Sequence, residues 1–368
     1  MNIHPLHRRG TLLLAGWLCA VALAAQAAPA GREERARQWS EALRTKVGSP
    51  GLSAAVAVDG KVVWAEGFGL ADVENQVPVR PEVRFRLGSV SKLLTAAAAV
   101  RLVEQGKLDL DAPVQRYVPS FPEKGPDKGQ PVTARQLAGH LAGIRHYNVQ
   151  DFARPPKAYA RLSDGLEIFK DDPLVHPPGT GYLYSSYGYN LLGVAVEGAS
   201  GKDFASAVDE LVLQPLGLRG TVLDRPEAVL EWRARPYARD SGGNLKNAPA
   251  IDSSYKWPSA GYLSTAGDLV RFASAHLGDG FLKPETRGLL FTSQRTASGE
   301  ETGVGIGWRI GKDSAGRRFL HHGGAIEGGR AFLLVYPDQR VAVALLTNLS
   351  GARFAEGEAQ ELAQIFMD

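Results

Sequence analysis

The chain has 368 residues, of which 44% are hydrophobic and 22% are charged, and its formal net charge is +3. This length and composition support a large buried core in one or two domains and exclude an intrinsically disordered chain. The nearly balanced charge gives no reason to expect nucleic acid or acidic lipid as a partner.

Residues 1–27 have the pattern of a secretory signal peptide. Arg8 and Arg9 precede an apolar run over residues 11–25, and the Ala-Gln-Ala sequence at 25–27 suits signal peptidase. The run is shorter than the roughly 20 apolar residues of a membrane span, although an uncleaved anchor would start in the same way. Cleavage would remove Cys19, the only cysteine. We therefore expect a secreted or periplasmic protein without disulfides, in contact with a membrane only if the segment is retained.

The mature chain begins with one helix and two strands. Residues 31–48 predict an amphipathic helix, because Trp39, Leu43 and Val47 recur at helical spacing. Residues 51–58 and 61–69 read as strands, and the Asp-Gly dipeptide between them favours the tight turn of a hairpin.

The C-terminal part again has mostly the alternation of strands, and helical patterns dominate between the two ends. Strands are predicted at 305–310, 317–321, 330–336 and 341–349, before a closing helix at 355–367. The simplest α+β assembly is an antiparallel sheet built from residues 28–79 and 301–368 and covered by the terminal helices. Residues 80–300 would form an inserted, mainly helical region, and together these parts would make one domain.

A serine and a lysine stand one helical turn apart in the segment LGSVSKLLTAAAA. Gly88 can supply a bend, and strong helix formers follow as far as Gly106. Ser89 would then begin a helix with Lys92 on the same face. A lysine buried there loses its charge easily and could take the serine proton, while the Ser89 N–H helps to bind an oxyanion. A capping serine with a lysine that extends into water would show the same pattern.

Two other segments offer partners for this pair. In YLYSSYGYN, Tyr184 precedes a new helix and could relay a proton, or it could be one of several buried aromatic residues. In FLHHGGAIEGG, a strand ending at His321 and His322 could present N–H groups to a substrate carbonyl, or the glycines could form a turn beside surface histidines.

No motif predicts a metal or another cofactor. A histidine pair without a third ligand is a poor metal site, and GVGIGWRIG does not complete a dinucleotide-binding motif. His140 and His146 could approach the catalytic residues, and we interpret both as structural.

The segments SVSK at 89–92, YSS at 184–186 and HHG at 321–323 resemble the three motifs of a known family in order and approximate separation. The family is that of serine β-lactamase-like and penicillin-binding-type hydrolases, especially the class C-like group. LAGHLAGIRHY and DSSYKWPSAGYLSTAGDL extend the resemblance to the branch that contains the mitochondrial serine β-lactamase-like proteins. The resemblance covers residues 51–367. It implies a β-lactamase/DD-peptidase-like fold, with a five-stranded antiparallel sheet and a site between the sheet and the helical region.

By position, this resemblance makes Ser89 the acylated nucleophile, Lys92 its base and Tyr184 a second acid/base group. It makes His321 the residue that closes the pocket on the strand. The N–H groups of Ser89 and Gly324 would form the oxyanion hole. The substrate-binding residues that the resemblance implies are Ser186, His321, Gly323 and Gly324.

Two departures from the family pattern affect the expected substrate. Ser186 replaces an asparagine whose amide would contact a substrate amide, so recognition of a β-lactam side chain should be poor. His321 replaces a lysine, so binding of a substrate carboxylate should weaken and depend on pH near neutrality.

The sequence therefore predicts a secreted serine hydrolase of peptide or ester bonds. Peptides of D-amino acids are included, and β-lactamase activity should be weak or absent. The alternative is a binding or assembly protein that keeps the fold with little turnover. We expect a small-molecule or peptide substrate, and the pattern does not exclude a homo-oligomer.

Overall fold

The computed structural model describes residues 1, 31–124, 131–152 and 157–367. Apart from Met1, the predicted signal peptide at residues 1–27 lies outside the described residues and stays a prediction. Residues Arg32–Asp368 form one compact unit.

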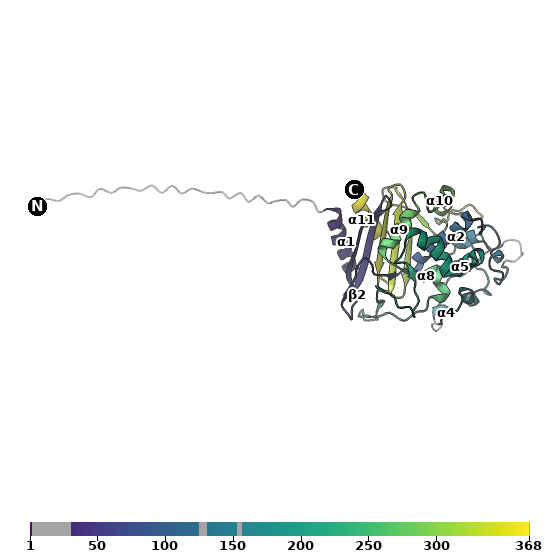
Figure 1. Ribbon diagram of the computed structural model, residues 1–368, viewed down its shortest axis with the longest axis horizontal. Helices are drawn as coiled ribbons and strands as arrows, with labels where there is room; N and C mark the ends of the chain where they lie inside the picture. The colour runs from purple at the N-terminus through teal and green to yellow at the C-terminus, as the bar shows by residue number, and fades with distance from the viewer. Residues whose placement is uncertain (2–30, 125–130, 153–156, 368) are drawn as a thin grey trace. The chain divides into compact units, whose positions relative to one another are not determined.

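A seven-stranded antiparallel sheet combines strands from the two ends of the chain, and its order is β3-β2-β1-β12-β11-β10-β9. The strands are β1 (Gly51–Val58), β2 (Lys61–Asp72), β3 (Val77–Pro78), β9 (Arg309–Lys312), β10 (Arg318–Ile326), β11 (Gly329–Tyr336) and β12 (Val341–Thr347). In Figure 1 the purple N-terminal strands lie beside the yellow C-terminal strands. The predicted α+β class is confirmed. The sheet has seven strands instead of five, because the short strands β3 and β9 extend its two edges.

Local backbone geometry explains one correct and one wrong strand boundary. Asp59 and Gly60 have φ values of 51° and 82°, as the predicted hairpin turn requires. The strand predicted to begin at residue 305 begins only at Arg309. Ile306 and Trp308 are fully buried although they precede the strand. Their apolar character therefore reflects burial in the core and not pairing in the sheet.

The sheet is buried on both faces. In β12, Val341, Val343 and Leu345 belong to an outer core with residues of the terminal helices α1 (Arg32–Lys46) and α11 (Glu356–Met367). Alternate β12 residues belong to a larger inner core with the helical region: Ala342, Ala344 and Leu346. Because side chains of a strand alternate between faces, one apolar strand serves both cores.

Residues 80–300 are rich in helices, as predicted. The α-helices are α2 (Ser91–Glu104), α3 (Ala134–Ala138), α4 (Val149–Phe152), α5 (Ser186–Ser200), α6 (Phe204–Val208), α7 (Gln214–Leu216), α8 (Trp257–Ala260), α9 (Ala266–Ala275) and α10 (Pro284–Phe291). Short 3-10 helices occur at η1 (Gly88–Val90), η2 (Val114–Arg116), η3 (Leu162–Ile168) and η5 (Ser254–Lys256), and a π-helical turn at η4 (Asp209–Leu213). Helices α2, α5 and α8 pack together, and α9 contacts β1 and β12 (Figure 1).

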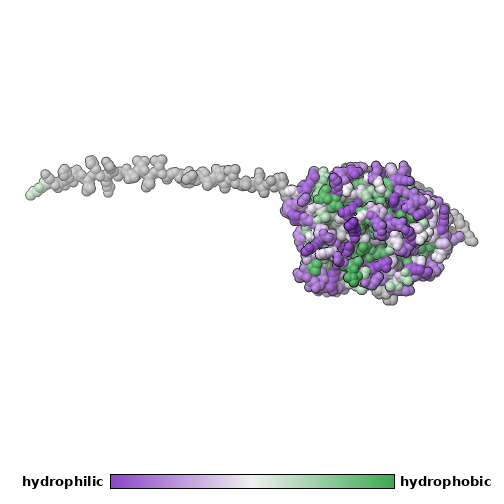
Figure 2. Space-filling model, in the orientation of Figure 1, coloured by the Kyte–Doolittle hydropathy of each residue, from purple (hydrophilic) through white to green (hydrophobic). Residues whose placement is uncertain are grey.

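Two small sheets also lie within residues 80–300, and the helical pattern does not predict them. One consists of β4 (Phe85–Arg86), β8 (Tyr262–Ser264) and β5 (Val222–Leu223), and the other of β6 (Tyr237–Arg239) and β7 (Leu245–Asn247). Hydrophilic residues cover most of the face shown in Figure 2. Within the described ranges, we find no helix with the length and apolar character needed to span a membrane.

Candidate active site

Ser89 lies in the 3-10 turn η1, which leads directly into α2. Gly88 has a φ of 52°, and a Cβ at this position would lie 2.8 Å from the backbone nitrogen of Ala325 in β10. Only glycine accommodates both the positive φ and this close approach. The turn is therefore pressed against β10, and Ser89 lies at the boundary between the helical region and the sheet.

Lys92 is fully buried in α2 beside Ser89. Its Nζ lies 3.2 Å from the Ser89 Oγ and 3.0 Å from the Ser186 Oγ, and it donates a 3.0 Å hydrogen bond to the Ser259 carbonyl. The predicted spacing thus brings the serine and the lysine together. Desolvation lowers the pKa of Lys92 from its usual value, and the nearby Tyr184 only partly opposes this effect.

Tyr184 completes this cluster. It immediately precedes Ser185, which is the N-cap residue of α5. The Lys92 Nζ lies 4.9 Å from the centroid of the Tyr184 ring. Burial by itself would raise the pKa of Tyr184, but the adjacent Lys92 and the Ser89 hydroxyl lower it below its usual value. Lys92 and Tyr184 are therefore a coupled pair, in which each group favours the charged form of the other.

The adjacent histidines of β10 lie on opposite faces of the sheet. The His321 ring stacks on Phe332 of the outer core, with centroids 5.5 Å apart. His322 is 2% exposed, and its ring centroid lies 6.4 Å from that of Tyr184. The prediction that His321 closes the pocket is wrong, because strand alternation turns His321 outward and His322 inward. The strand also continues past both histidines to Ile326.

The sequence led us to expect a histidine whose charge changes near neutral pH, and burial alters that expectation. Desolvation is the main cause that lowers the pKa of His321 to about 4 and the pKa of His322 well below its usual value. The Nδ1 of His322 donates to the Gly323 carbonyl over 2.7 Å, since a carbonyl oxygen only accepts, and Nε2 is then an acceptor in the neutral ring. Both rings are therefore neutral near pH 7, and the expected charge change moves to acidic pH.

Gly324 faces Ser89, whereas Gly323 faces the outer core. A Cβ on Gly324 would overlap the Leu87 carbonyl oxygen and lie 3.0 Å from the Ser89 nitrogen. A Cβ on Gly323 would instead lie 3.3 Å from the Phe332 ring. Strand β9 pairs with β10 only as far as His321, so the rest of this edge of β10 is not paired with β9. Free backbone groups there can face a substrate.

Ser186 takes part in two hydrogen bonds, one through its hydroxyl and one through its backbone N–H. Its Oγ is the atom 3.0 Å from the Lys92 Nζ, and its backbone N–H donates to the Nδ1 of His146 over 3.1 Å. The preceding N–H, of Ser185, donates in the same way to the Nδ1 of His140. Ser186, which we predicted to bind substrate, is thus 2% exposed, and its hydroxyl contacts Lys92.

Arg309 is a site residue that the motifs did not indicate. It is half-buried at the start of β9, and its guanidinium carbon lies 5.4 Å from the centroid of the Tyr184 ring. Its side chain forms no hydrogen bond or ion pair with any residue that the structure describes. No pattern in the segment GVGIGWRIG could have revealed this position, because the side chain reaches Tyr184 only in the folded chain.

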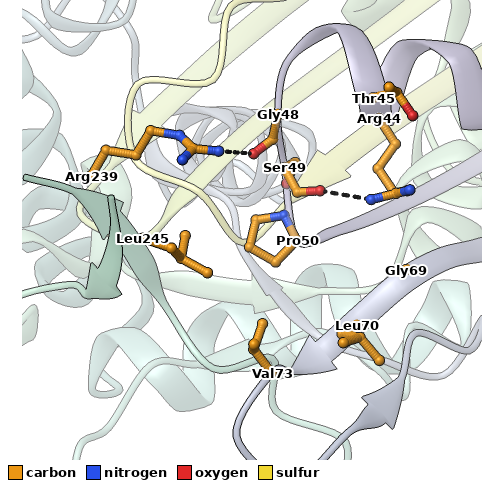
Figure 3. Close-up of a pocket in the computed structure, with 10 residues that line it drawn as sticks. All are labelled: Arg44, Thr45, Gly48, Ser49, Pro50, Gly69, Leu70, Val73, Arg239 and Leu245. Carbon is orange, nitrogen blue, oxygen red and sulfur yellow. Dashed lines mark hydrogen bonds between the residues drawn. The ribbon is translucent and has the colours of Figure 1, made fainter. Parts of the chain in front are cut away.

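Two other features of the described part of the chain bear on where a reaction could take place. In this part, no three His, Cys, Asp or Glu side chains gather in a way that could hold a metal ion. Figure 3 shows a pocket between the end of α1, the turn that precedes β1, the end of β2 and the β6–β7 hairpin. Its volume is about 560 Å³. Arg44 and Arg239 line it and donate to the backbone carbonyls of Ser49 and Gly48, and none of the predicted catalytic residues lines it.

Curated relatives match most of the chain. The human mitochondrial serine beta-lactamase-like protein LACTB is 33% identical over 83% of this chain and 72% of its own length. Esterase EstB of Burkholderia gladioli is 33% identical over 77% of this chain and 81% of its own length. Both alignments support the resemblance that the motifs indicate.

Solved structures match the fold. The octameric penicillin-binding protein homologue of Pyrococcus abyssi superimposes with a TM-score of 0.78 and 26% identity, over 90% of this chain and 77% of that one. The crystal structure of SurE with D-Leu superimposes with a TM-score of 0.73 and 27% identity, over 91% of this chain and 75% of that one. Residues 36–365 match the family model described as Beta-lactamase, and the chain belongs to this family of serine hydrolases.

Proposed function

We propose that this protein is an exported serine hydrolase that forms an acyl-enzyme at Ser89 and acts on peptide or ester bonds. The observation that carries the proposal is the set of contacts around Lys92. A neutral amine has two N–H donors and one lone pair. The donors match the Ser259 carbonyl and the Ser186 hydroxyl, which leaves the lone pair for the Ser89 O–H at 3.2 Å.

The proposed reaction moves one proton around this cluster. Ser89 Oγ attacks the substrate carbonyl while its proton passes to the Lys92–Tyr184 pair. Tyr184 then gives a proton to the departing amine or alcohol as the acyl-enzyme forms. Water attacks the ester in the second half of the reaction and gives a proton to the pair, and the pair passes that proton to Ser89 Oγ as the acid leaves. The neutral His322 borders this exchange and offers Nε2 as an acceptor.

The oxyanion would be held at the junction of η1 and β10. One donor is the Ser89 N–H at the start of the helix, where the dipole also favours negative charge. Successive N–H groups of a strand point to opposite edges, so the second donor is either Gly324 or its neighbour Ala325, but not both. Two such donors typically lower the barrier by several kcal/mol.

Arg309 and two of the relatives narrow the substrate class. A half-buried guanidinium that has no hydrogen-bond or ion-pair partner among the described residues suits a carboxylate. The esterase name of one relative and the D-Leu bound by another support esters and D-amino-acid peptides as substrate classes. We therefore propose a peptide or ester with a free carboxylate, and weak or absent turnover of β-lactams because no asparagine stands at Ser186.

Export and assembly complete the proposal. The pattern at residues 1–27 supports release into the periplasm or medium, and the octameric relative makes a homo-oligomer a reasonable expectation. Mass spectrometry of secreted protein would reveal the mature N-terminus, and light scattering would reveal the oligomer.

The test is intact-mass spectrometry of the mature protein after exposure to a fluorophosphonate. We expect a single adduct on the wild type and none on Ser89→Ala, with hydrolysis of activated esters reduced at least about a thousandfold in the variant. Substrates with and without a free carboxylate then test the role of Arg309. Absence of an adduct on both proteins would favour the alternative, a binding or assembly protein with the same fold.

A further inference from the structure

His146 lies next to the catalytic cluster but has no part in the reaction described above. Its ring centroid lies 5.3 Å from that of Tyr184, and its Nδ1 accepts the N–H of Ser186, whose hydroxyl contacts Lys92. The ring is half-buried. Exposed atoms of this ring therefore lie next to the cluster of Ser89, Lys92 and Tyr184.

The hydrogen bond with Ser186 determines which nitrogen of His146 carries the proton. A backbone N–H can only donate, so Nδ1 must accept, and a neutral ring must then carry its proton on Nε2. His322 has the opposite tautomer, because its Nδ1 donates to a carbonyl. The site thus has one neutral imidazole that donates and one that accepts.

The Nε2–H of His146 is available to a ligand. It makes no hydrogen bond with another described residue, and it does not belong to the buried polar atoms that lack a partner. The ring also remains neutral near pH 7, since burial and the nearby Lys92 lower its pKa to about 4. A neutral N–H donor of this kind can bind a carbonyl oxygen, which only accepts.

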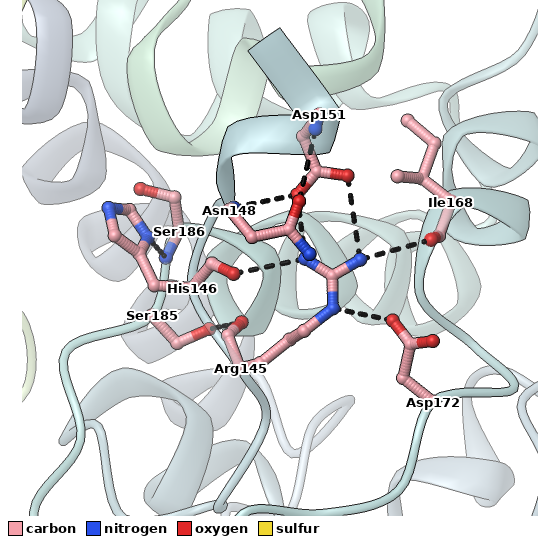
Figure 4. Close-up of polar contacts among 8 residues, drawn as sticks. All are labelled: Arg145, His146, Asn148, Asp151, Ile168, Asp172, Ser185 and Ser186. Atoms are coloured by element: carbon pink, nitrogen blue, oxygen red, sulfur yellow. Dashed lines mark hydrogen bonds and ion pairs between the residues drawn. The ribbon is translucent and has the colours of Figure 1, made fainter. Parts of the chain in front are cut away.

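The loop that carries His146 is held rigidly. Figure 4 shows Arg145 between two carboxylates, with Asp151 at 2.7 Å and Asp172 at 2.5 Å. Its guanidinium also donates to the His146 carbonyl over 3.1 Å, and the Ser185 hydroxyl donates to the Arg145 carbonyl over 2.9 Å. The loop and the start of α5 are therefore joined on both sides of the histidine. Because the loop is already ordered, a ligand that binds to this donor causes little further loss of conformational entropy.

We propose that His146 positions the substrate by donating its Nε2–H to a carbonyl oxygen in the acyl part, such as the amide next to the scissile bond of a peptide. This inference rests on the proposed acyl-enzyme at Ser89. It favours N-acylated amino acids and peptides over simple fatty acyl esters, because only the former carry an acceptor at that distance.

Two nearly isosteric esters test the proposal: N-acetylglycine p-nitrophenyl ester and p-nitrophenyl isocaproate, in which carbon replaces the amide. In His146→Asn the shorter amide oxygen can still accept from Ser186, but no donor reaches the Nε2 position. We expect this variant to lower the kcat/KM ratio of the first ester to the second about tenfold, the usual value of one hydrogen bond. The longer His146→Gln side chain can return an N–H to that position and should restore most of the ratio.

The controls separate positioning from structure and from the reaction itself. His176→Asn makes the same change on a neighbouring loop and should leave the ratio unchanged. The rate of fluorophosphonate labelling should also stay near the wild-type value in His146→Asn, because that probe has no acyl-side carbonyl. Equal losses on both esters, or no loss on either, would overturn the role of His146 and leave Ser89 chemistry intact. If the wild type reacts with neither ester nor the fluorophosphonate, the proposed function fails and this inference fails with it.

Discussion

The two faces of the central sheet are both buried, yet the polar cluster around Lys92 lies on one side only. Under α1 and α11 the outer core is almost entirely apolar, with Trp64, Phe332 and Leu362 among its members. The inner side buries Lys92, Ser186 and His322 next to the partly exposed Tyr184. The contrast shows that similar burial can enclose either an almost purely apolar core or a group of polar side chains that are partners for one another.

The largest expected effect comes from removing one hydroxyl on the inner side. Tyr184→Phe keeps the ring but cannot protonate a leaving group. Turnover of a peptide or anilide should fall about a thousandfold and turnover of an activated ester only about tenfold, since p-nitrophenolate leaves without a proton. Steady-state kinetics on a matched anilide and ester would show the difference. Equal losses on both would argue against Tyr184 as the acid.

The second prediction uses the adjacent histidines to compare the faces directly. His322→Leu should lower kcat/KM about a hundredfold, because it removes the acceptor beside Tyr184. His321→Leu places an apolar side chain against Phe332 and should leave kcat/KM within about twofold of the wild type. Thermal melts of both variants control for folding. Comparable losses in the two variants would mean that the face assignment has no functional consequence.

On the outer face, a cavity should affect stability without changing the chemistry. Leu362→Ala in α11 removes a fully buried side chain and should lower the free energy of unfolding by about 2 to 5 kcal/mol. Urea denaturation would measure this loss. Fluorophosphonate labelling under native conditions should keep its wild-type rate, and a slower rate would show that the outer core also shapes the site.

The smallest expected effect is a pH dependence of stability that originates at Lys92. Burial lowers its pKa in the folded state. Between that lowered pKa and the usual value near 10.5, the unfolded chain binds a proton that the folded chain lacks, so stability rises with pH in this window. In Lys92→Met this contribution should disappear. Denaturation of both proteins at several pH values in this window would give the free energy of unfolding as a function of pH. The same pH dependence in both proteins would mean that Lys92 is charged in the folded state.

Local patterns were sufficient for the terminal elements and for the contact between Ser89 and Lys92. Alternation and the Asp-Gly turn predicted the first hairpin, and the helical spacing of Ser89 and Lys92 predicted their contact, because these features depend on neighbouring residues. The family motifs added Tyr184, which comes from a distant segment. Its position beside Lys92 in the structure agrees with that expectation.

Alternation did not determine which histidine faces the site. Phe319 and Leu320 are both apolar and lie on opposite sides of β10, since both faces of the sheet are covered. A strand with two apolar faces has no period of two in its hydrophobicity, so a shift of one residue cannot be detected. For the same reason the apolar residues 306 and 308 resembled a strand when they are buried in a loop.

By itself, the sequence determined the fold class, the order of the elements and the identity of the serine–lysine pair, because hydrophobic periodicity and short-range spacing depend only on nearby residues. The tertiary structure alone decided that His322 and not His321 faces the cluster, that Arg309 reaches Tyr184, and that His146 keeps its proton on Nε2. Each of these depends on which atoms of remote segments meet in space, and on the burial and hydrogen bonds that result from that meeting.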